Sequence, residues 1–245
     1  MTRLKLLGIS ASPRGEGNSH FLLSVASRAA EAAQEVETEI YSFEKKDFAP
    51  CVHCYGCRRT GDCVVQDDFQ DLAEKWFAAN ALLYSVPVYH MSIPGQLKCF
   101  LDRLGAVTAG RERAKGGETI SQKYLKPVGI ITQGMHAFSG QEHAATELIN
   151  HALLMGCLPI SGNLWQSYIS ASGWTECLPD KTALEDLVKQ GSPSAIATVT
   201  AAQAVGRNVA QLALIVKKGR EFICQDSVAN PVGNTLRIEE KGEAG

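Results

Sequence analysis

Three short apolar runs constrain the fold of this 245-residue chain more than any other feature of its sequence. They cover residues 4–9, 81–88 and 127–132. Runs of this length, with hardly a polar side chain, are typical of parallel strands that are buried on both faces. Two further strands are expected at 36–43, where apolar and polar residues alternate, and at 158–164. Hydrophobic residues make up 45% of the chain, enough for the core that such a sheet needs.

Helical segments separate these strands. Asn18 or Ser19 is expected to cap the first helix, and Asp67 or Asp68 to open the second. The alternation predicts an α/β fold, a flavodoxin-like doubly wound five-stranded parallel sheet in the order 2-1-3-4-5. Ligands of such sheets bind beyond the carboxyl ends of the strands, where the strand order reverses. Apolar residues at helical spacing place the helices at about 19–33, 67–79, 93–104 and 141–155.

The last third of the chain reads as helix. Two helices are expected at 179–190 and 194–218, the second ending at Gly219 after two lysines. Residues 108–124 are rich in glycine and charge, which predicts a mobile loop. We therefore expect a domain at 1–178, with a cysteine loop at 50–64, followed by a helical extension and tail at 179–245 that is a candidate for oligomer contacts.

Four of the eight cysteines lie in one loop, with gaps of two, two and five residues. Four thiolates this close together can converge on an iron–sulfur cluster or on a zinc ion. Gly56 and Gly61 allow the tight backbone that such wrapping requires. Three interpretations stay open: a cluster, zinc, or free thiols without metal. The candidate metal ligands are Cys51, Cys54, Cys57 and Cys63.

The loop after the first strand predicts a phosphate site. Arg14 offers a fork that suits phosphate oxygens, and the next helix points its amides at the same place. A dinucleotide loop would want a third glycine where His20 stands, so the loop favours a mononucleotide. The alternative is a polar strand-to-helix turn. The hydroxyl and amide groups of this candidate site belong to Ser10, Ser12, Asn18 and Ser19.

Two more loops are expected at the same edge of the sheet. Tyr89 could lie against a flavin ring, and His90 could relay a proton, so these two are the candidate catalytic residues. Amides around Gly134 could stabilise the reduced ring. The residues expected to contact the ring are Pro87, Val88, Tyr89 and His90 from one loop, and Thr132, Gln133 and Gly134 from the other.

Charge and hydropathy exclude several partners. Basic residues number 24 and acidic residues 26, a balance that argues against a nucleic-acid binder. No apolar run approaches the roughly 20 residues of a membrane span. We expect a cytoplasmic protein, where clustered cysteines indicate metal or redox chemistry more often than structural disulfides. Asp102 and Arg103 are expected to fix the end of a helix, and the four scattered cysteines to be packed or idle.

Four segments resemble the NADPH-dependent FMN reductase family: SASPR (10–14), PVY (87–89), GQLKCFLDR (95–103) and SGQE (139–142). The cysteine set, followed by two aspartates, resembles the iron–sulfur flavoprotein branch of that family. The resemblance runs from about residue 4 to about residue 162. It implies bound FMN, a [4Fe–4S] cluster on the four cysteines that exchanges electrons with FMN, and homodimers or homotetramers with the flavin near a subunit interface.

The resemblance implies an FMN-dependent oxidoreductase. NAD(P)H, as a transient co-substrate, or another donor would supply electrons through FMN, with or without the cluster, to a small-molecule acceptor or to a redox protein such as ferredoxin. Two alternatives stay open. One is a non-enzymatic flavin and iron–sulfur electron carrier. The other is a plain NAD(P)H:quinone or flavin reductase without a cluster.

Overall fold

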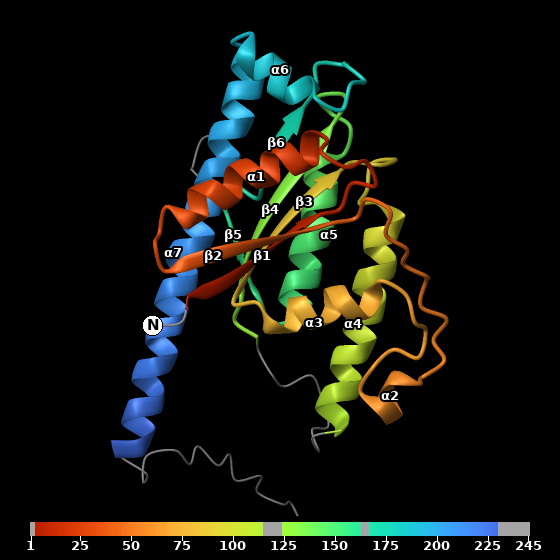
Figure 1. Ribbon diagram of the computed structural model, residues 1–245, viewed down its shortest axis with the longest axis vertical. Coiled ribbons are helices and arrows are strands. Elements are labelled where there is room, and N and C mark those ends of the chain that lie inside the picture. The colour runs from red at the N-terminus through yellow and green to blue at the C-terminus, as the bar shows by residue number, and fades with distance from the viewer. Residues whose placement is uncertain (1–2, 115–123, 163–166, 230–245) are drawn as a thin grey trace, which may run out of the picture.

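The computed structural model describes residues 3–114, 124–162 and 167–229, and its centre is a parallel sheet (Figure 1). Ser10 lies opposite both Ser42 and Ser85, so the first three strands end at the same level. The predicted flavodoxin-like fold and strand order 2-1-3-4-5 are confirmed. The strands on this path are β2 (Val36–Ser42), β1 (Leu4–Ser10), β3 (Ala81–Pro87), β4 (Pro127–Gly134) and β5 (Leu158–Ile160).

A sixth strand, β6 (Ala171–Trp174), was not expected. It pairs with the second half of β4, whereas β5 pairs with the first half, so the two short strands share one edge. The strand predicted at 158–164 is too long, since β5 ends at Ile160 and residues 163–166 lie outside the described part of the chain. The sequence Ala-Ser-Gly-Trp contains no β-branched residue, so β6 gives little strand signal.

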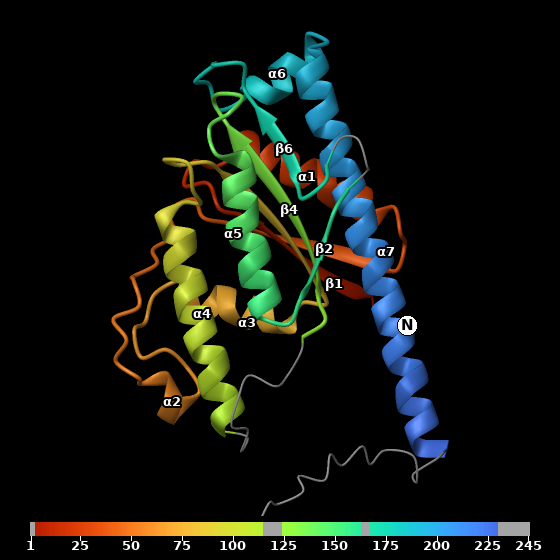
Figure 2. The same ribbon diagram turned by 180° about the vertical axis from the view of Figure 1, so that it is seen from behind.

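Helices cover both faces of the sheet (Figures 1 and 2). Leu4 and Leu6 of β1 join one core cluster, while Leu7 and Ile9 join the other. The first cluster packs beneath α1 (Asn18–Glu31), α6 (Ala183–Lys189) and α7 (Pro193–Ala229). The second packs beneath α3 (Phe69–Ala78), α4 (Gly95–Ala114) and α5 (Gln141–Leu154), and the short α2 (Cys57–Thr60) lies outside α4.

Helix α4 is longer than predicted. It continues past Leu104 to Ala114, so the mobile loop expected at 108–124 is wrong over its first seven residues, 108–114. Thr108 is fully buried and its hydroxyl donates to the Leu104 carbonyl. Residues 115–123 of that segment lie outside the described part. The glycines that suggested a loop serve packing instead: a β-carbon on Gly110 would lie 2.2 Å from the Cys57 carbonyl oxygen.

Helix α7 does not end at Gly219 as predicted, but continues to Ala229. Its first half crosses α1 closely, because a β-carbon on Gly206 would lie 2.1 Å from the Ala26 carbonyl oxygen. The stretch Pro193–Phe222 is long and apolar enough to cross a membrane, with mean hydropathy 1.2, but 44% of its apolar window is buried in the protein. Length and composition are therefore weak support for a span. The domain boundary at residue 178 stays a prediction.

Candidate functional site

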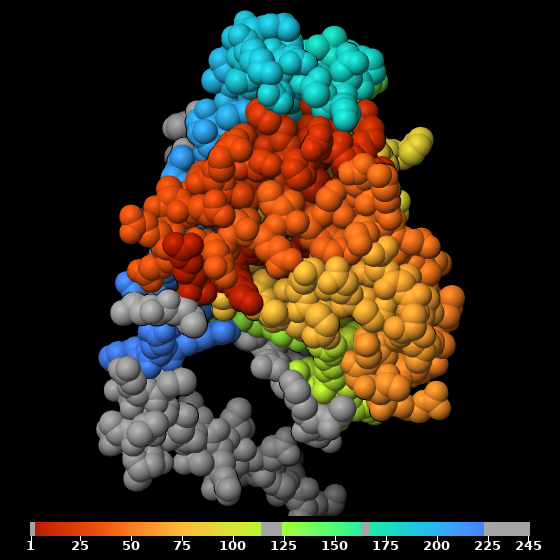
Figure 3. Space-filling view, viewed as in Figure 1, coloured from red at the N-terminus to blue at the C-terminus, as the bar shows by residue number. Residues whose placement is uncertain are grey.

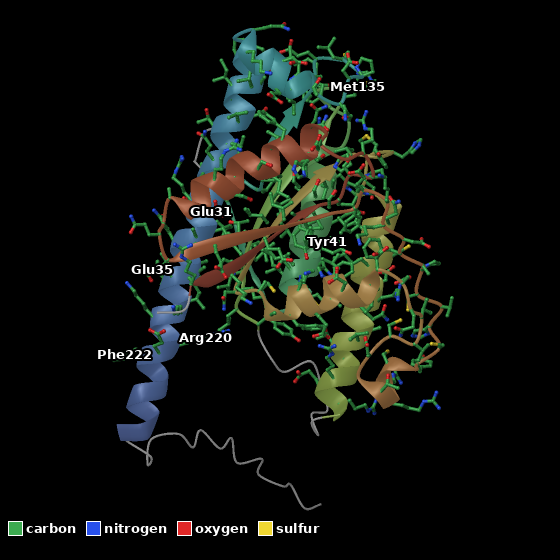
Figure 4. All side chains as sticks on the ribbon, viewed as in Figure 1. Glu31, Glu35, Tyr41, Met135, Arg220 and Phe222 are labelled. Atoms are coloured by element: carbon green, nitrogen blue, oxygen red, sulfur yellow. The ribbon has the colours of Figure 1, made fainter. Side chains whose placement is uncertain are left out.

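A cavity of about 100 Å³, called here the strand-end cavity, opens at the carboxyl ends of β1, β3, β4 and β6. Met135, which marks this end of the molecule in Figure 4, is one of its walls. Loops that are far apart in the sequence meet here because parallel strands end at one edge. Seven of the predicted cofactor residues line it: Arg14, Asn18, Pro87, Val88, Tyr89, Gln133 and Gly134.

Three of the remaining predicted residues lie buried behind the first loop. The hydroxyl of Ser10 is buried and has no partner among the described residues. Leaving such a group unpaired costs about 1–3 kcal/mol, so an oxygen-rich ligand would be favoured there. Ser12 is also buried, and its hydroxyl accepts from the Arg14 amide at 3.2 Å. Ser19 is buried at the start of α1.

Asn18 does not cap α1, and neither does Ser19. The N-cap is Gly17, without a side-chain cap bond. The Asn18 amide donates to the Asp180 carbonyl at 3.0 Å and accepts from the Leu184 amide at 2.9 Å. Asn18 therefore holds the segment after β6 against the first loop. Its role as a phosphate ligand stays a prediction.

Tyr89 begins a tight turn of unusual conformation. It exchanges two backbone hydrogen bonds with Ser92, at 2.9 and 3.0 Å. The two residues between them, His90 and Met91, have φ values of 47° and 69°. Left-handed backbone at non-glycine residues costs on the order of 1–3 kcal/mol each and clusters at functional sites. His90 is exposed and does not line the strand-end cavity, whereas Tyr89 does. The turn therefore presents Tyr89, and not His90, to the cavity.

Helix α5 holds this turn in place. The Glu147 carboxylate accepts from the Ser92 hydroxyl at 2.7 Å and from the Ile93 amide at 3.2 Å. A β-carbon on Gly140, which precedes α5, would lie 2.5 Å from the Met91 α-carbon. The sequence did not single out Glu147, because its partner turn is 55 residues away and gives no local signal.

The third loop is held by hydrogen bonds, too. The Gln141 side chain accepts from the Ser139 amide and donates to the His136 carbonyl. Thr132 is buried, and its hydroxyl bonds that of Ser172 at 2.9 Å.

The segment after β6 supplies walls that sequence reasoning missed. Thr175, Leu178 and Pro179 line the strand-end cavity. Next to them, Cys177 is exposed and not packed, with its sulfur 3.2 Å from His136 Nδ1. The other expected alternative, an idle thiol, stays a prediction.

The four clustered cysteines line a second space of about 150 Å³, called here the cysteine cavity. Its other walls include Val107 and Arg103 of α4. Among the described residues, no three His, Cys, Asp or Glu side chains stand ready as a metal site. The donor set nevertheless suits a soft metal, because four thiols border one small space. Cys51 and Cys54 are exposed, while Cys57 and Cys63 are half-buried.

The backbone of the cysteine loop turns sharply. Gly61 has φ 72°, as its residue type allows, but the other left-handed positions are His53 (φ 53°) and Tyr55 (φ 58°), not Gly56. Burial raises the pKa of the Cys57 thiol, and charge repulsion from the other three cysteines raises it further. A cation bound in the cavity would offset this repulsion and lower the pKa of the Cys57 thiol.

Arg103 does not fix a helix end as predicted. It lies in the middle of α4, is 1% exposed and pairs with Asp67 at 2.6 Å. Burial would raise the pKa of Asp67, but hydrogen bonds from Arg103 and two backbone amides hold it below its usual value. Arg103 also reaches the cysteine loop, where its Nε donates to the Cys63 sulfur at 3.3 Å.

The cysteine loop lies away from the strand ends. The chain leaves β2 at the strand ends, since the Phe43 amide donates to the Ser10 carbonyl, but it then runs along α4 on the surface of the molecule, at the right of Figures 1 and 3. Cys57 abuts Gly110, fifteen residues beyond the start of α4 at Gly95. At 1.5 Å per residue that is roughly 22 Å along the helix. Within one chain, the cysteine cavity therefore lies along α4, away from the loops that line the strand-end cavity.

Comparisons with known proteins agree with this architecture. The sequence model of the NADPH-dependent FMN reductases matches residues 4–168. An iron–sulfur flavoprotein of Methanocaldococcus jannaschii is 27% identical over 220 residues, 88% of this chain and 100% of that protein. An iron–sulfur flavoprotein of Archaeoglobus fulgidus is 29% identical over 171 residues, 69% of this chain and 82% of that one.

A solved structure shares the fold. RosB with its bound intermediate, 8-demethyl-8-formylriboflavin 5′-phosphate, has a TM-score of 0.61 at 16% identity, covering 99% of this chain and 98% of that one. At this identity the likeness concerns the fold alone. The family match ends at residue 168, before the segment that supplies Thr175, Leu178 and Pro179.

Proposed function

Because the chain belongs to the NADPH-dependent FMN reductase family, we propose that it takes electrons from NAD(P)H or another donor and passes them, through FMN and a [4Fe–4S] cluster, to an acceptor. The family makes the protein an FMN-dependent oxidoreductase. The route through a cluster is supported by one observation above all: the four clustered cysteines border a single cavity. The acceptor would be a small molecule or a redox protein such as ferredoxin.

The strand-end cavity has groups that suit FMN. The unpaired Ser10 hydroxyl, the Arg14 guanidinium and the N-terminal amides of α1 would hold the phosphate. The strained turn would present Tyr89 to the ring, with Gln133 and Gly134 on the polar edge. FMN supplies the exchange between two-electron and one-electron transfer.

A nicotinamide would approach from the open side of this cavity. Tyr89 is 40% exposed, and Met135 and Leu178 are exposed to a similar extent, so these side chains form an apolar rim. Hydride transfer needs orientation more than acid–base groups. The rim would orient the nicotinamide ring and keep water away, while His90 stays a candidate proton relay outside the cavity.

The cysteine cavity suits an iron–sulfur cluster. Cys51, Cys54, Cys57 and Cys63 would be the ligands, because soft iron prefers thiolate sulfur. The walls from α4 are apolar apart from Arg103, which limits access of water. A bound cation would offset the charge repulsion that, after burial, raises the pKa of the Cys57 thiol.

Two subunits would bring the two cavities together. Within one chain they lie at different levels of α4, but both are bordered by exposed apolar side chains. Val52 is 69% exposed beside the cysteines, and Phe138 is 97% exposed beside the strand ends. We propose a homodimer or homotetramer in which the cysteine cavity of one subunit faces the strand-end cavity of another. Such pairing would bury both sets of apolar side chains.

Anaerobic purification followed by analysis of flavin, iron and acid-labile sulfide tests the proposal. We expect about one FMN and four irons per chain, with a broad absorption shoulder beside the flavin bands. NAD(P)H oxidation should reduce both chromophores. FMN with almost no iron, together with full reductase activity, would favour the alternative of a plain flavin reductase without a cluster. Iron and FMN without any oxidation of NAD(P)H would favour the alternative of a non-enzymatic electron carrier.

A further inference from the structure

Arg103 reaches both ends of the cysteine loop from a fully buried position. Its Nη1 donates to the Ala49 carbonyl at 3.2 Å, just before the first cysteine. Its Nη2 donates to the Val65 carbonyl at 2.7 Å, just after the last one. Its guanidinium carbon lies 4.3 Å from the centre of the Phe69 ring. The guanidinium is therefore fixed in position and direction.

One donor of this guanidinium points at sulfur. Nε lies 3.3 Å from the Cys63 sulfur, while Nη1 donates to the carboxylate of Asp67. A neutral thiol is a weak acceptor, but a metal-bound thiolate is a stronger one. The same contact therefore gains strength when Cys63 becomes a ligand.

We propose that Arg103 is a positioning residue that donates an N–H···S hydrogen bond to metal-bound Cys63 and thereby raises the reduction potential of the site. The inference rests on the proposed cluster. Reduction adds negative charge, which a fixed donor and a buried cation favour. Arg103 would also retain the metal by tying down both ends of the loop.

Arg111 provides a matched control on the same helix. Its Nε donates to the Gly61 carbonyl of the same loop at 2.9 Å, and its guanidinium stacks on Phe77 at 4.2 Å. It pairs with Glu74, as Arg103 pairs with Asp67. It donates to a carbonyl and not to a sulfur. Arg111 therefore also holds the cysteine loop on α4, but it makes no hydrogen bond to a proposed metal ligand.

The experiment compares anaerobically purified wild type, Arg103→Gln and Arg111→Gln by iron analysis and by a redox titration of the cluster signal. We expect Arg103→Gln to titrate at a more negative potential and to lose iron several-fold faster, with FMN retained. Arg111→Gln should keep the wild-type potential. Equal potentials for all three proteins would overturn the inference. Wild type without iron would instead overturn the proposed cluster itself.

Asp67→Asn keeps the inference testable if Arg103→Gln does not fold. Removing this carboxylate leaves the Arg103 charge uncompensated near the sulfur, so the potential should become more positive. A purely structural role of Arg103 predicts at most the smaller rise that comes from losing the Asp67 charge itself. An unchanged or more negative potential in Asp67→Asn would count against Arg103 as the tuning group.

Discussion

The strand-end cavity is bounded by loops from four strands, whereas the cysteine cavity is bounded by one loop and one face of a helix. The first follows from topology, since parallel strands must end together. The second depends on where a single loop comes to rest. It rests on α4 because Gly110 lets Cys57 approach and because Arg103 and Arg111 hold its carbonyls.

A substitution that removes the ligand of one cavity should therefore leave the ligand of the other in place. Flavin binding depends on the ends of β1, β3, β4 and β6. None of the described residues that line the strand-end cavity also lines the cysteine cavity. Helix α4 is the shared element, since it begins after the Tyr89 turn and carries the wall of the cysteine cavity. Substitutions on either side of it separate the two regions.

Replacing Cys57 by serine should have the largest effect. Cys57 is half-buried and borders the cavity, and serine oxygen is a poor ligand for soft iron. We expect nearly all iron to be lost while FMN content stays at the wild-type level. Cys99→Ser, a change on α4 outside the cysteine loop, should keep both. Loss of FMN in parallel with iron would mean that the two regions are coupled.

A methyl group on Gly110 should be the next most damaging change. The added carbon would lie 2.2 Å from the Cys57 carbonyl oxygen, so α2 must move. Overpacking of this kind costs about 1–3 kcal/mol of unfolding free energy, and we expect several-fold less iron per chain. Gly105→Ala is the control, because its β-carbon meets nothing within 4 Å. That change should stabilise the helix by about 0.5–1 kcal/mol. Equal iron contents in both variants would contradict this packing.

Helix α4 shows where prediction from the sequence stopped being correct. The apolar runs predicted the strands, because a buried strand needs apolar residues whatever surrounds it. The alternation of strands with helices predicted the strand order. The loops at the strand ends could be assigned to one cavity for the same reason. Gly110 was misjudged because a glycine in a loop and a glycine at a close helix contact look alike in sequence.

Long-range partners gave no signal at all. Arg103 meets Cys63 across 40 residues, and Asn18 meets Asp180 across 162. The sequence predicted local roles for both side chains. Arg103 was expected to fix a helix end, and Asn18 to cap a helix or bind a phosphate. Buried hydrogen bonds of this kind depend on tertiary packing, which no spacing in the sequence encodes.

On the strand-end side, Arg14→Ala should lower FMN affinity by about tenfold or more, since a charge-assisted hydrogen bond contributes roughly 1.5–3 kcal/mol. Arg14 is exposed at the cavity, and its guanidinium makes one long 3.4 Å contact, to the Pro179 carbonyl, within the described part of the chain, so it can meet a phosphate. FMN retained after dialysis measures the effect. Arg28→Ala, in the last turn of α1, the helix that follows the Arg14 loop, should retain FMN like wild type. Iron content should not change in either variant.

The smallest effect concerns His151 on α5. Burial lowers its pKa from 6.5 to about 4, with the charges of Asp102 and Lys98 as lesser influences, and its Nε2 is buried without a partner among the described residues. Between pH 6.5 and pH 4 the unfolded chain binds a proton that the folded chain does not. Unfolding free energy should therefore fall on acidification through this window, by at most about 1.4 kcal/mol per pH unit.

Denaturant unfolding of His151→Leu as a function of pH checks this. The variant should lose less stability than wild type between pH 6.5 and pH 4, because it has no imidazole to protonate. His143→Gln, an exposed change on the same helix, should follow the wild-type profile. Iron and FMN should leave together only where acid unfolds the whole protein, because global unfolding destroys both cavities. If iron leaves first at a pH where unfolding has not begun, the cysteine cavity has an acid sensitivity of its own, and His151 is not its source.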